Sequence, residues 1–444
     1  MLILPAEIYA REFDARLLQG VIAVERGWKV LVGSKALINR SIWRFQPSVY
    51  LCQTLTHKRR TMLNLLSKLG HTSFGWDEEG LVYYDRDIYL MRRVSSDTLA
   101  LLQKIFTWGQ QSADDVNYRA RGLGMQAVPL GNPRFDMVRP ELHALYAKEI
   151  AEIKERFGKF VLIDTNFSSF NPIISLHDLK QRSVSKKNIP VASEQENFQK
   201  RQSHRKIIYE HFLSDLPRFT AAHPELNFVV RAHPAENELT WIKRFEGQAN
   251  VSVVREGSSV PWLIAASALI HNGCTTAVEA AIIGKTPIAY CPAISLAEES
   301  ALPNPISHRA RDLMELALAV RSAAAGSLEM GNSQHEILRR YVSGIKGPFA
   351  SQAVMDELED LSPKNGAWLS FLRVLMLGFA RLRDVYKSGR RDHITDRYLE
   401  KVFPLITASS VQARVDEIAL VLNVQRKIIV REIADNIFEL DIRA

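Results

Sequence analysis

The sequence predicts an α/β protein with two parallel sheets, each built from its own series of strands and helices. Short apolar runs alternate with stretches of helical apolar spacing up to residue 140, and the same alternation restarts at residue 159. A charged amphipathic stretch lies between the two series, and the pattern changes again after residue 361. The 444 residues suffice for two or three domains, so we expect Rossmann-like lobes at 1–140 and 159–361, a connector helix at 141–158 and a helical segment at 362–444.

The first series contains five candidate strands and two clear candidate helices. The strands are the apolar runs at residues 2–5, 28–34, 48–54, 81–85 and 104–109. Helical spacing of apolar residues marks 11–27, which ends at Gly27, and a basic stretch at 57–69. Strands that alternate with helices in this way form parallel sheets.

The second series repeats the pattern. Its candidate strands are residues 159–166, 227–234, 251–256, 268–273 and 286–292, with helices at 261–268 and 275–284. A polar stretch at 170–206 interrupts the series, and we interpret it either as a surface loop or as a flap near the acceptor. In such sheets ligands bind beyond the carboxyl ends of the strands.

Composition excludes several classes of protein. The chain has only three cysteines (Cys52, Cys274 and Cys291) and no CxxC pair, so we expect a reducing, cytoplasmic setting. Its first residues lack the pattern of a signal peptide, and no run of about 18 apolar residues predicts a membrane span. The net charge of +8 favours anionic partners. Neither lobe has a basic stripe with interleaved aromatic residues, so we expect no nucleic-acid partner.

Three adjacent carboxylates precede Gly80. Asp77, Glu78 and Glu79 lie in a predicted loop, where mutual repulsion raises the pKa of at least one carboxylate and suits it to act as a general base. The alternative is an exposed acidic turn.

A His-Pro turn follows the apolar strand at 227–230. This places His233 at the carboxyl edge of the sheet, where it can contact or protonate a phosphate, and Pro234 fixes the turn. Arg231 offers a forked anion donor. The alternative is a structural histidine at a strand end.

The next strand gives way to a glycine turn and a helix. Asn272 and Gly273 form the turn, Thr275 and Thr276 fall at the helix start, and Glu279 lies one turn further on, within reach of a ribose hydroxyl. Free backbone N–H groups, the helix dipole and two hydroxyls make such a start an anion site. The alternative is an ordinary capped helix, and the turn is not a P-loop.

Other candidates are weaker. Cys274 has no general base implied by spacing, and Asp85 and Asp87 form a DxD sequence within a strand pattern, so we assign neither a nucleophile nor a metal site. No His or Cys cluster has zinc-like spacing. We therefore expect no metal and no cofactor.

Taken together, the three clusters resemble the GT-B glycosyltransferases over about residues 1–350. Glu78-Glu79-Gly80, His233-Pro234 and Thr275-Thr276 are similar to the acidic, HP and Ser/Thr motifs of bacterial sialyltransferases and Kdo transferases. REFDARLL, DEEG, GNPRFD and HNGCTTAVEAAIIGKTPI resemble the bacterial surface carbohydrate biosynthesis proteins. A similar HNG(S/T)T helix occurs in CDP-glycerol glycerophosphotransferases and in UDP-N-acetylglucosamine 2-epimerases.

The resemblance implies a glycosyltransferase that moves an ulosonic sugar (Kdo, sialic acid or a relative) from a CMP donor to a glycan or lipid-linked acceptor of a capsule or lipopolysaccharide. Glu79 or Glu78, with Asp77 third, would then deprotonate the acceptor or attack the anomeric carbon. His233 would help CMP leave, and Thr275 and Thr276 would cradle its phosphate. The alternatives are a CDP-alditol phosphotransferase and a non-catalytic scaffold.

The C-terminal segment lies outside this resemblance. Residues 364–391 carry seven basic residues and one acidic residue among Trp, Phe and Leu. Such a helix can lie on the inner membrane surface, or it can pack against the lobes or a partner.

Overall fold

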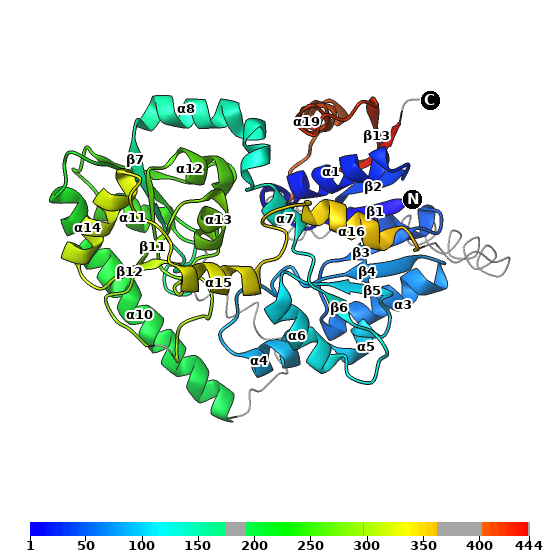
Figure 1. The fold of residues 1–444 in the computed structure, drawn as a ribbon, viewed down its shortest axis with the longest axis horizontal. Helices are drawn as coiled ribbons and strands as arrows, with labels where there is room; N and C mark the ends of the chain where they lie inside the picture. Colours follow the sequence, from blue (N-terminus) through cyan, green and yellow to red (C-terminus); the bar gives the residue numbers. More distant parts are fainter. Residues whose placement is uncertain (174–191, 296, 362–401, 443–444) are drawn as a thin grey trace, which may run out of the picture. The chain divides into compact units, whose positions relative to one another are not determined.

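The computed structural model describes residues 1–173, 192–295, 297–361 and 402–442. They divide into two compact α/β units (Figure 1). Unit 1 combines Met1–Leu81 and Tyr89–Leu145 with the chain from Arg340 onward, and unit 2 combines Val82–Ile88 with Tyr146–Arg339. Two such units with parallel sheets confirm the predicted fold class.

Unit 1 is built on an eight-stranded sheet with the order β13-β14-β2-β1-β3-β4-β5-β6. Its six parallel strands are β1 (Leu2–Ala6), β2 (Val30–Ser34), β3 (Val49–Cys52), β4 (Thr72–Gly75), β5 (Lys104–Phe106) and β6 (Ala127–Val128). Its main helices are α1 (Tyr9–Glu25), α2 (Lys35–Ser41), α3 (Arg60–Lys68), α4 (Arg86–Arg93), α5 (Ser96–Leu99), α6 (Gln110–Arg119), α7 (Pro133–Asp136) and α16 (Ala350–Leu358). The apolar periodicity of α1 buries Leu17, Leu18 and Val21 in the core of the unit.

The predicted strand at 81–85 is absent, and the neighbouring β4 takes its place in the sheet. Leu81 is buried and Tyr84 is exposed, and residues 82–85 pair with no strand of the sheet. In β4, Gly75 approaches the carbonyl of Cys52 so closely that an added Cβ would lie 2.3 Å from that oxygen. The strand therefore depends on its neighbours in the sheet more than on its own sequence.

The described part of the C-terminal segment adds strands to unit 1, where we predicted only helices. After α19 (Ala408–Val421), the strands β13 (Ile428–Ala434) and β14 (Ile437–Ile442) form an antiparallel hairpin. β14 then pairs antiparallel with β2 and buries Phe438 and Leu440. The hairpin thus extends the sheet of unit 1. The basic stretch at 364–391 lies outside the described residues.

Unit 2 holds a six-stranded, fully parallel sheet with the order β12-β11-β10-β7-β8-β9. The strands are β7 (Phe160–Asp164), β8 (Asn227–Arg231), β9 (Val251–Val254), β10 (Ala268–His271), β11 (Ile288–Tyr290) and β12 (His308–Ala310). The chain runs outward from β7 to β9 and then returns to place β10 on the other side of β7. The strand order therefore reverses between β7 and β10, which is the point where open α/β sheets bind ligands.

Helices cover both faces of this second sheet. α10 (Ala192–Ala221), α11 (Glu238–Arg244) and α14 (Leu313–Ala324) enclose a core that contains Phe212, Trp241 and Leu316. On the other face, α8 (Ala147–Phe157), α12 (Ser259–Ala265) and α13 (Thr276–Ile283) pack around Ile153 and Trp262. α15 (Asn332–Tyr341) leads out of the unit.

Two sequence predictions concern the segments around β7. The connector predicted at 141–158 is a 3-10 helix (Pro140–Tyr146) followed by α8. Of the polar stretch at 170–206, residues 174–191 lie outside the described part and residues 192–206 belong to α10. Among the described residues, no helix is long and apolar enough to cross a membrane.

Candidate functional site

The carboxyl ends of β7, β8 and β10 carry most of the residues that the sequence singled out in unit 2. Asp164 ends β7, Arg231 ends β8, and the turn that starts at Asn272 follows β10. These three strands are neighbours in the sheet, so the fold places the groups along one edge.

The turn after β10 is fixed by a buried histidine. The Nδ1 atom of His271 accepts a hydrogen bond from the Gly273 N–H at 3.0 Å, and its Nε2 atom pairs with the Ser307 hydroxyl at 2.8 Å. Burial lowers the pKa of His271 to about 3, so the ring is neutral. Gly273 has φ +81°, a left-handed conformation that favours glycine. His271 and Gly273 therefore shape the turn.

The helix that follows begins with exposed polar groups. Thr275 occupies the N-cap position of α13 without a side-chain cap, and it is exposed, while Thr276 is half-buried. The first N–H groups of a helix have no intrahelical acceptor, so this end can bind an anion. Cys274 is buried, and burial raises the pKa of its thiol to about 11, which argues against a nucleophilic thiolate.

Arg231 places a fixed positive charge at the same edge. Its Nη2 atom donates to the carbonyls of Glu256 and Gly257, each at 3.0 Å, while its Nε atom is buried without a hydrogen-bond partner among the described residues. Burial lowers the pKa of Arg231, and the carboxylates of Asp164 and Glu279 oppose that effect. Because guanidinium groups stay charged in proteins, the arginine remains a cation with donor capacity to spare.

Burial also raises the pKa of Asp164, while Arg231 and the Thr276 hydroxyl oppose that shift. The sequence analysis did not single out Asp164. A carboxylate at the end of β7 becomes relevant only once β7 is known to lie between β8 and β10.

His233 is held in one orientation by its own turn. Its Nδ1 atom accepts the Ala235 N–H at 3.1 Å, so in the neutral ring the proton lies on Nε2. The carbonyl of Pro234 accepts a hydrogen bond from Arg255, and the N–H of Glu236 donates to the His233 carbonyl at 2.7 Å. The N–H donor of the neutral ring is therefore Nε2–H, a type of group that can pair with a phosphate oxygen.

Glu236 is a buried carboxylate that the sequence analysis did not assign to the site. It accepts hydrogen bonds from the Thr165 hydroxyl at 3.0 Å, the Phe167 N–H at 2.7 Å and the Trp241 indole at 3.1 Å. It therefore ties the loop after β7 to the His-Pro turn after β8. The only indication in the sequence was an acidic residue directly behind the turn.

Glu279 was predicted to reach a ribose hydroxyl. It is buried in α13 and accepts a hydrogen bond from the Ser259 hydroxyl at 2.8 Å. Ser259 is the first residue of α12, so the carboxylate links two helices beside the turn after β10.

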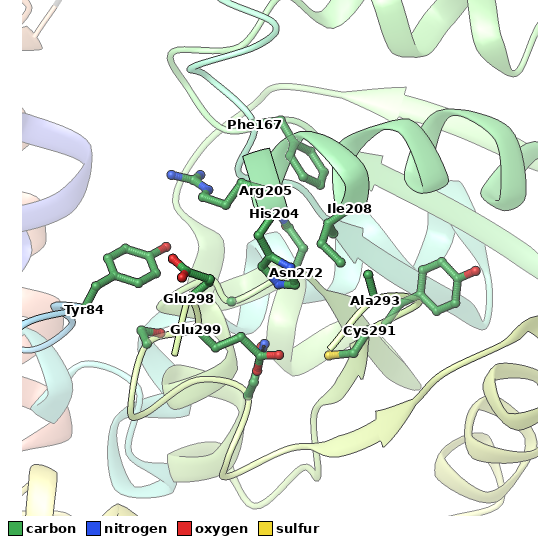
Figure 2. Close-up of a pocket in the computed structure, with 14 residues that line it drawn as sticks. Tyr84, Phe167, His204, Arg205, Ile208, Asn272, Cys291, Ala293, Glu298 and Glu299 are labelled. Atoms are coloured by element: carbon green, nitrogen blue, oxygen red, sulfur yellow. Dashed lines mark hydrogen bonds between the residues drawn. The ribbon is translucent and has the colours of Figure 1, made fainter. Parts of the chain in front are cut away.

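A hollow of about 450 Å³, partly open to solvent, adjoins the turn after β10 (Figure 2). Asn272 and Gly273 form part of its wall. The other lining residues come from β11 and the loop behind it, from α10, from the loop after β7 and from residue 84; they are Tyr84, Phe167, His204, Arg205, Ile208, Tyr290, Cys291, Ala293, Glu298, Glu299, Ser300 and Asn304.

The acidic cluster lies in unit 1, where the three carboxylates have different environments. Glu78 is buried and bonded to Arg16 and to the Trp76 indole. Burial acts to raise the pKa of Glu78, but Arg16 and Arg134 outweigh it and lower the pKa to about 2. This carboxylate is therefore a poor proton acceptor.

The other two carboxylates of the cluster differ in exposure. Asp77 is buried and paired with Arg93; burial raises the pKa of Asp77 and the arginine opposes that shift. Glu79 is 53% exposed and pairs with Arg11 at 2.8 Å. Glu79 is thus the one carboxylate of this cluster that is exposed to solvent. The nearby Asp85 caps α4 by accepting the Ile88 N–H at 2.9 Å.

No family profile and no curated protein match the chain. Solved structures share its fold. One, a UDP-N-acetylglucosamine 2-epimerase, has 10% sequence identity and a TM-score of 0.50, over 82% of this chain and 98% of that one. The enzyme of the same name from Neisseria meningitidis, bound to UDP-GlcNAc, has 12% sequence identity and a TM-score of 0.49, over 81% of this chain and 99% of that one. The MnaA–UDP structure from S. aureus has 12% sequence identity and a TM-score of 0.49, over 82% of this chain and 99% of that one.

These similarities identify the fold as GT-B, as predicted. They contradict the predicted transfer of an ulosonic sugar from a CMP donor, because the structure with a TM-score of 0.50 is a UDP-N-acetylglucosamine 2-epimerase and not a CMP-sugar transferase.

Proposed function

We propose that unit 2 binds a UDP-linked sugar and that the protein is an enzyme of nucleotide-sugar metabolism that breaks the bond between the sugar and the diphosphate. The observation that carries this proposal is the cluster of anion donors at the point where the strand order of the sheet reverses. Arg231, the Nε2–H of His233 and the start of α13 all lie on the carboxyl edge there.

The spacing of these groups suits a diphosphate. β7 lies between β8, which ends in Arg231, and β10, which leads into the 272–276 turn. Adjacent strands are about 4.8 Å apart, so the backbones of β8 and β10 end roughly 10 Å apart along the edge. A diphosphate with its two substituents can lie along such an edge. The names of the similar structures supply uridine as the nucleoside.

The chemistry follows from the charges. When the sugar–oxygen bond breaks, negative charge develops on the departing diphosphate. Arg231, His233 and the N–H groups of Thr275 and Thr276 can stabilise that charge. The anomeric carbon forms a new bond to the hydroxyl oxygen of water or of an acceptor, and the proton of that hydroxyl passes to a carboxylate. The exposed Glu79 of unit 1 is our candidate for that role.

Calorimetry with UDP, CDP, CMP and ADP tests the proposal. We expect UDP to bind more tightly than CMP. We expect His233→Ala to lower the affinity for UDP by about 10- to 100-fold, which is the usual contribution of one or two charge-assisted hydrogen bonds. His223→Ala is the matched control, because His223-Pro224 precedes β8 at the opposite edge of the sheet and its ring bonds the Phe219 carbonyl. Absence of UDP binding, or equal losses in both variants, would refute the proposal.

A Glu79→Gln variant tests the catalytic role. We expect it to bind UDP normally and to lose most of the turnover of a UDP-sugar, measured as UDP release or as a change in the sugar product. A variant with wild-type turnover would exclude Glu79 as the proton-transfer group.

A further inference from the structure

Three acceptor oxygens in the wall of the hollow are buried and lack hydrogen-bond partners within the described ranges. They are Asn272 Oδ1, Asn304 Oδ1 and Glu299 Oε1. Buried polar atoms in native proteins are almost always paired, so a group of three around one hollow needs an explanation. All three are acceptors, and their complement is therefore a ligand that carries several donors.

The acceptors are held in place by their neighbours. Glu299 uses its other oxygen, Oε2, to accept from the Asn304 amide nitrogen and from Arg309, each at 2.9 Å. Because the Asn304 nitrogen faces Glu299, the Asn304 oxygen is left as an acceptor. The same loop is tied to β10, since the Ser307 hydroxyl bonds both the Pro303 carbonyl and His271. The acceptors therefore stay in position when no ligand is bound.

The charge of the wall adds a second constraint. Glu298 and Glu299 both line the hollow (Figure 2). The Arg205 guanidinium also lines it, but its Nη2 atom donates to the Asn166 carbonyl at 2.7 Å. A bound carboxylate would offer no donors to the three acceptors and would face the carboxylate of Glu298 and that of Glu299, which is paired with Arg309. A sugar hydroxyl can donate to each acceptor without that repulsion.

The hollow is also in the right place for the sugar of the proposed substrate. Asn272 and Gly273 belong both to its wall and to the turn that leads into α13. The rest of the wall comes from β11 and the loop behind it, from α10, from the loop after β7 and from residue 84. A diphosphate bound at the turn would therefore have one of its two substituents next to the hollow.

We propose that this hollow is a sugar subsite in which Asn272, Glu299 and Asn304 select a glycosyl group with free hydroxyl donors and exclude one that carries a carboxylate. This inference rests on the proposed binding of a UDP-sugar. Glu299 and Asn304 are then specificity-determining residues, since they contact the sugar and leave the diphosphate to Arg231 and His233.

Calorimetry on the full chain with UDP, UDP-glucose and UDP-glucuronate tests the inference. These two sugars differ at one carbon, which bears a hydroxyl in the first and a carboxylate in the second. We expect UDP-glucose to bind at least about 10-fold more tightly than UDP-glucuronate. Asn304→Ala and Glu299→Gln should each remove most of the difference by which UDP-glucose binds more tightly than UDP. Glu299→Gln should also reduce the ratio of the affinities for UDP-glucose and UDP-glucuronate.

UDP itself is the internal control for folding, because its affinity should change by no more than about twofold in either variant. The exposed Glu246→Gln, in the same unit, should behave as wild type for all three nucleotides. Two results would refute the subsite and leave the proposed function intact. In the first, UDP binds but UDP-glucose and UDP-glucuronate have equal affinities. In the second, both variants lower the affinity for UDP as much as the affinity for UDP-glucose. If UDP fails to bind to the wild type, the proposed function falls, and the subsite with it.

Discussion

Replacing Glu236 by alanine should both destabilise unit 2 and weaken nucleotide binding. The side chain is 0% exposed and accepts hydrogen bonds from three groups: the Thr165 hydroxyl, the Phe167 N–H and the Trp241 indole. Its removal leaves three buried donors unpaired, at about 1–3 kcal/mol each when none can find another partner. The hydroxyl of Thr165 can rotate toward other acceptors, so we expect a net loss of about 3–5 kcal/mol in the free energy of unfolding.

Glu236→Gln is the informative companion. It keeps the shape and one acceptor oxygen but turns an amide N–H₂ toward groups that are themselves donors, so we expect a smaller loss of about 1–3 kcal/mol. Urea unfolding gives the magnitudes, and hydrogen exchange shows where the protection is lost. Peptides that cover 164–171 and 232–241 should exchange faster, because Glu236 connects those two loops.

Glu246 is exposed in the same unit, so Glu246→Gln is the control for the loss of one negative charge. Since the N–H of Glu236 also closes the turn onto the His233 carbonyl, the glutamine variant should reduce UDP affinity in parallel with the loss of local protection. A glutamine variant with wild-type stability and unchanged exchange in both loops would refute the role that we assign to this carboxylate.

Three further predictions follow from single contacts. Gly273→Ala forces a left-handed φ of +81° on alanine, so calorimetry should show weaker UDP binding, with a strain of about 1–2 kcal/mol in urea unfolding. Glu78→Gln should lower the free energy of unfolding most at pH 6 and progressively less toward pH 2, as measured by urea titrations at several pH values. The folded-state pKa of Glu78, about 2, lies below its ordinary value of 4.5, so the stability that the carboxylate contributes is lost as the pH falls from 4.5 to 2. Phe438→Ala, in β14, should lower the unfolding free energy by about 3–5 kcal/mol, whereas a dispensable tail would show no change.

Much of the sheet architecture could be predicted because its strands are self-contained apolar runs. β1, β2, β7 and β8 are buried on both faces, and their sequences show it directly. β4 could not be found in this way, because Thr72–Gly75 contains one large apolar side chain and becomes a strand only through pairing with β3 and β5.

The sequence analysis also missed the C-terminal hairpin, but for a different reason. Its strands alternate in character and are separated by a turn at Asp435 and Asn436, with φ +55° at Asn436. Such a pattern predicts a hairpin from sequence alone. The expectation of a continuous helical segment obscured it.

The site was partly predictable for the same physical reason. His233, Asn272 and Gly273 stand directly behind apolar strands, and a parallel sheet brings strand ends together. The three carboxylates at 77–79 could not be ranked, since their environments come from Arg16, Arg93 and Arg11, which are distant in the sequence. Likewise, the three acceptors of the hollow come from two loops, one after β10 and one after β11, so their convergence is a property of the tertiary structure.

Two features of unit 2 now give a physical reason for the failure of the CMP-ulosonic hypothesis. An ulosonic donor carries one phosphate and a sugar carboxylate. The anion donors on β8 and after β10 lie along one edge of the sheet, where a diphosphate can extend between them. The hollow beside them presents unpaired acceptors and two glutamates, which repel a carboxylate and attract hydroxyl donors. The two features lie on different loops, so the substitutions at His233 and Glu299 test them separately. On our proposal, the first reduces binding of every nucleotide, while the second changes only the choice of sugar.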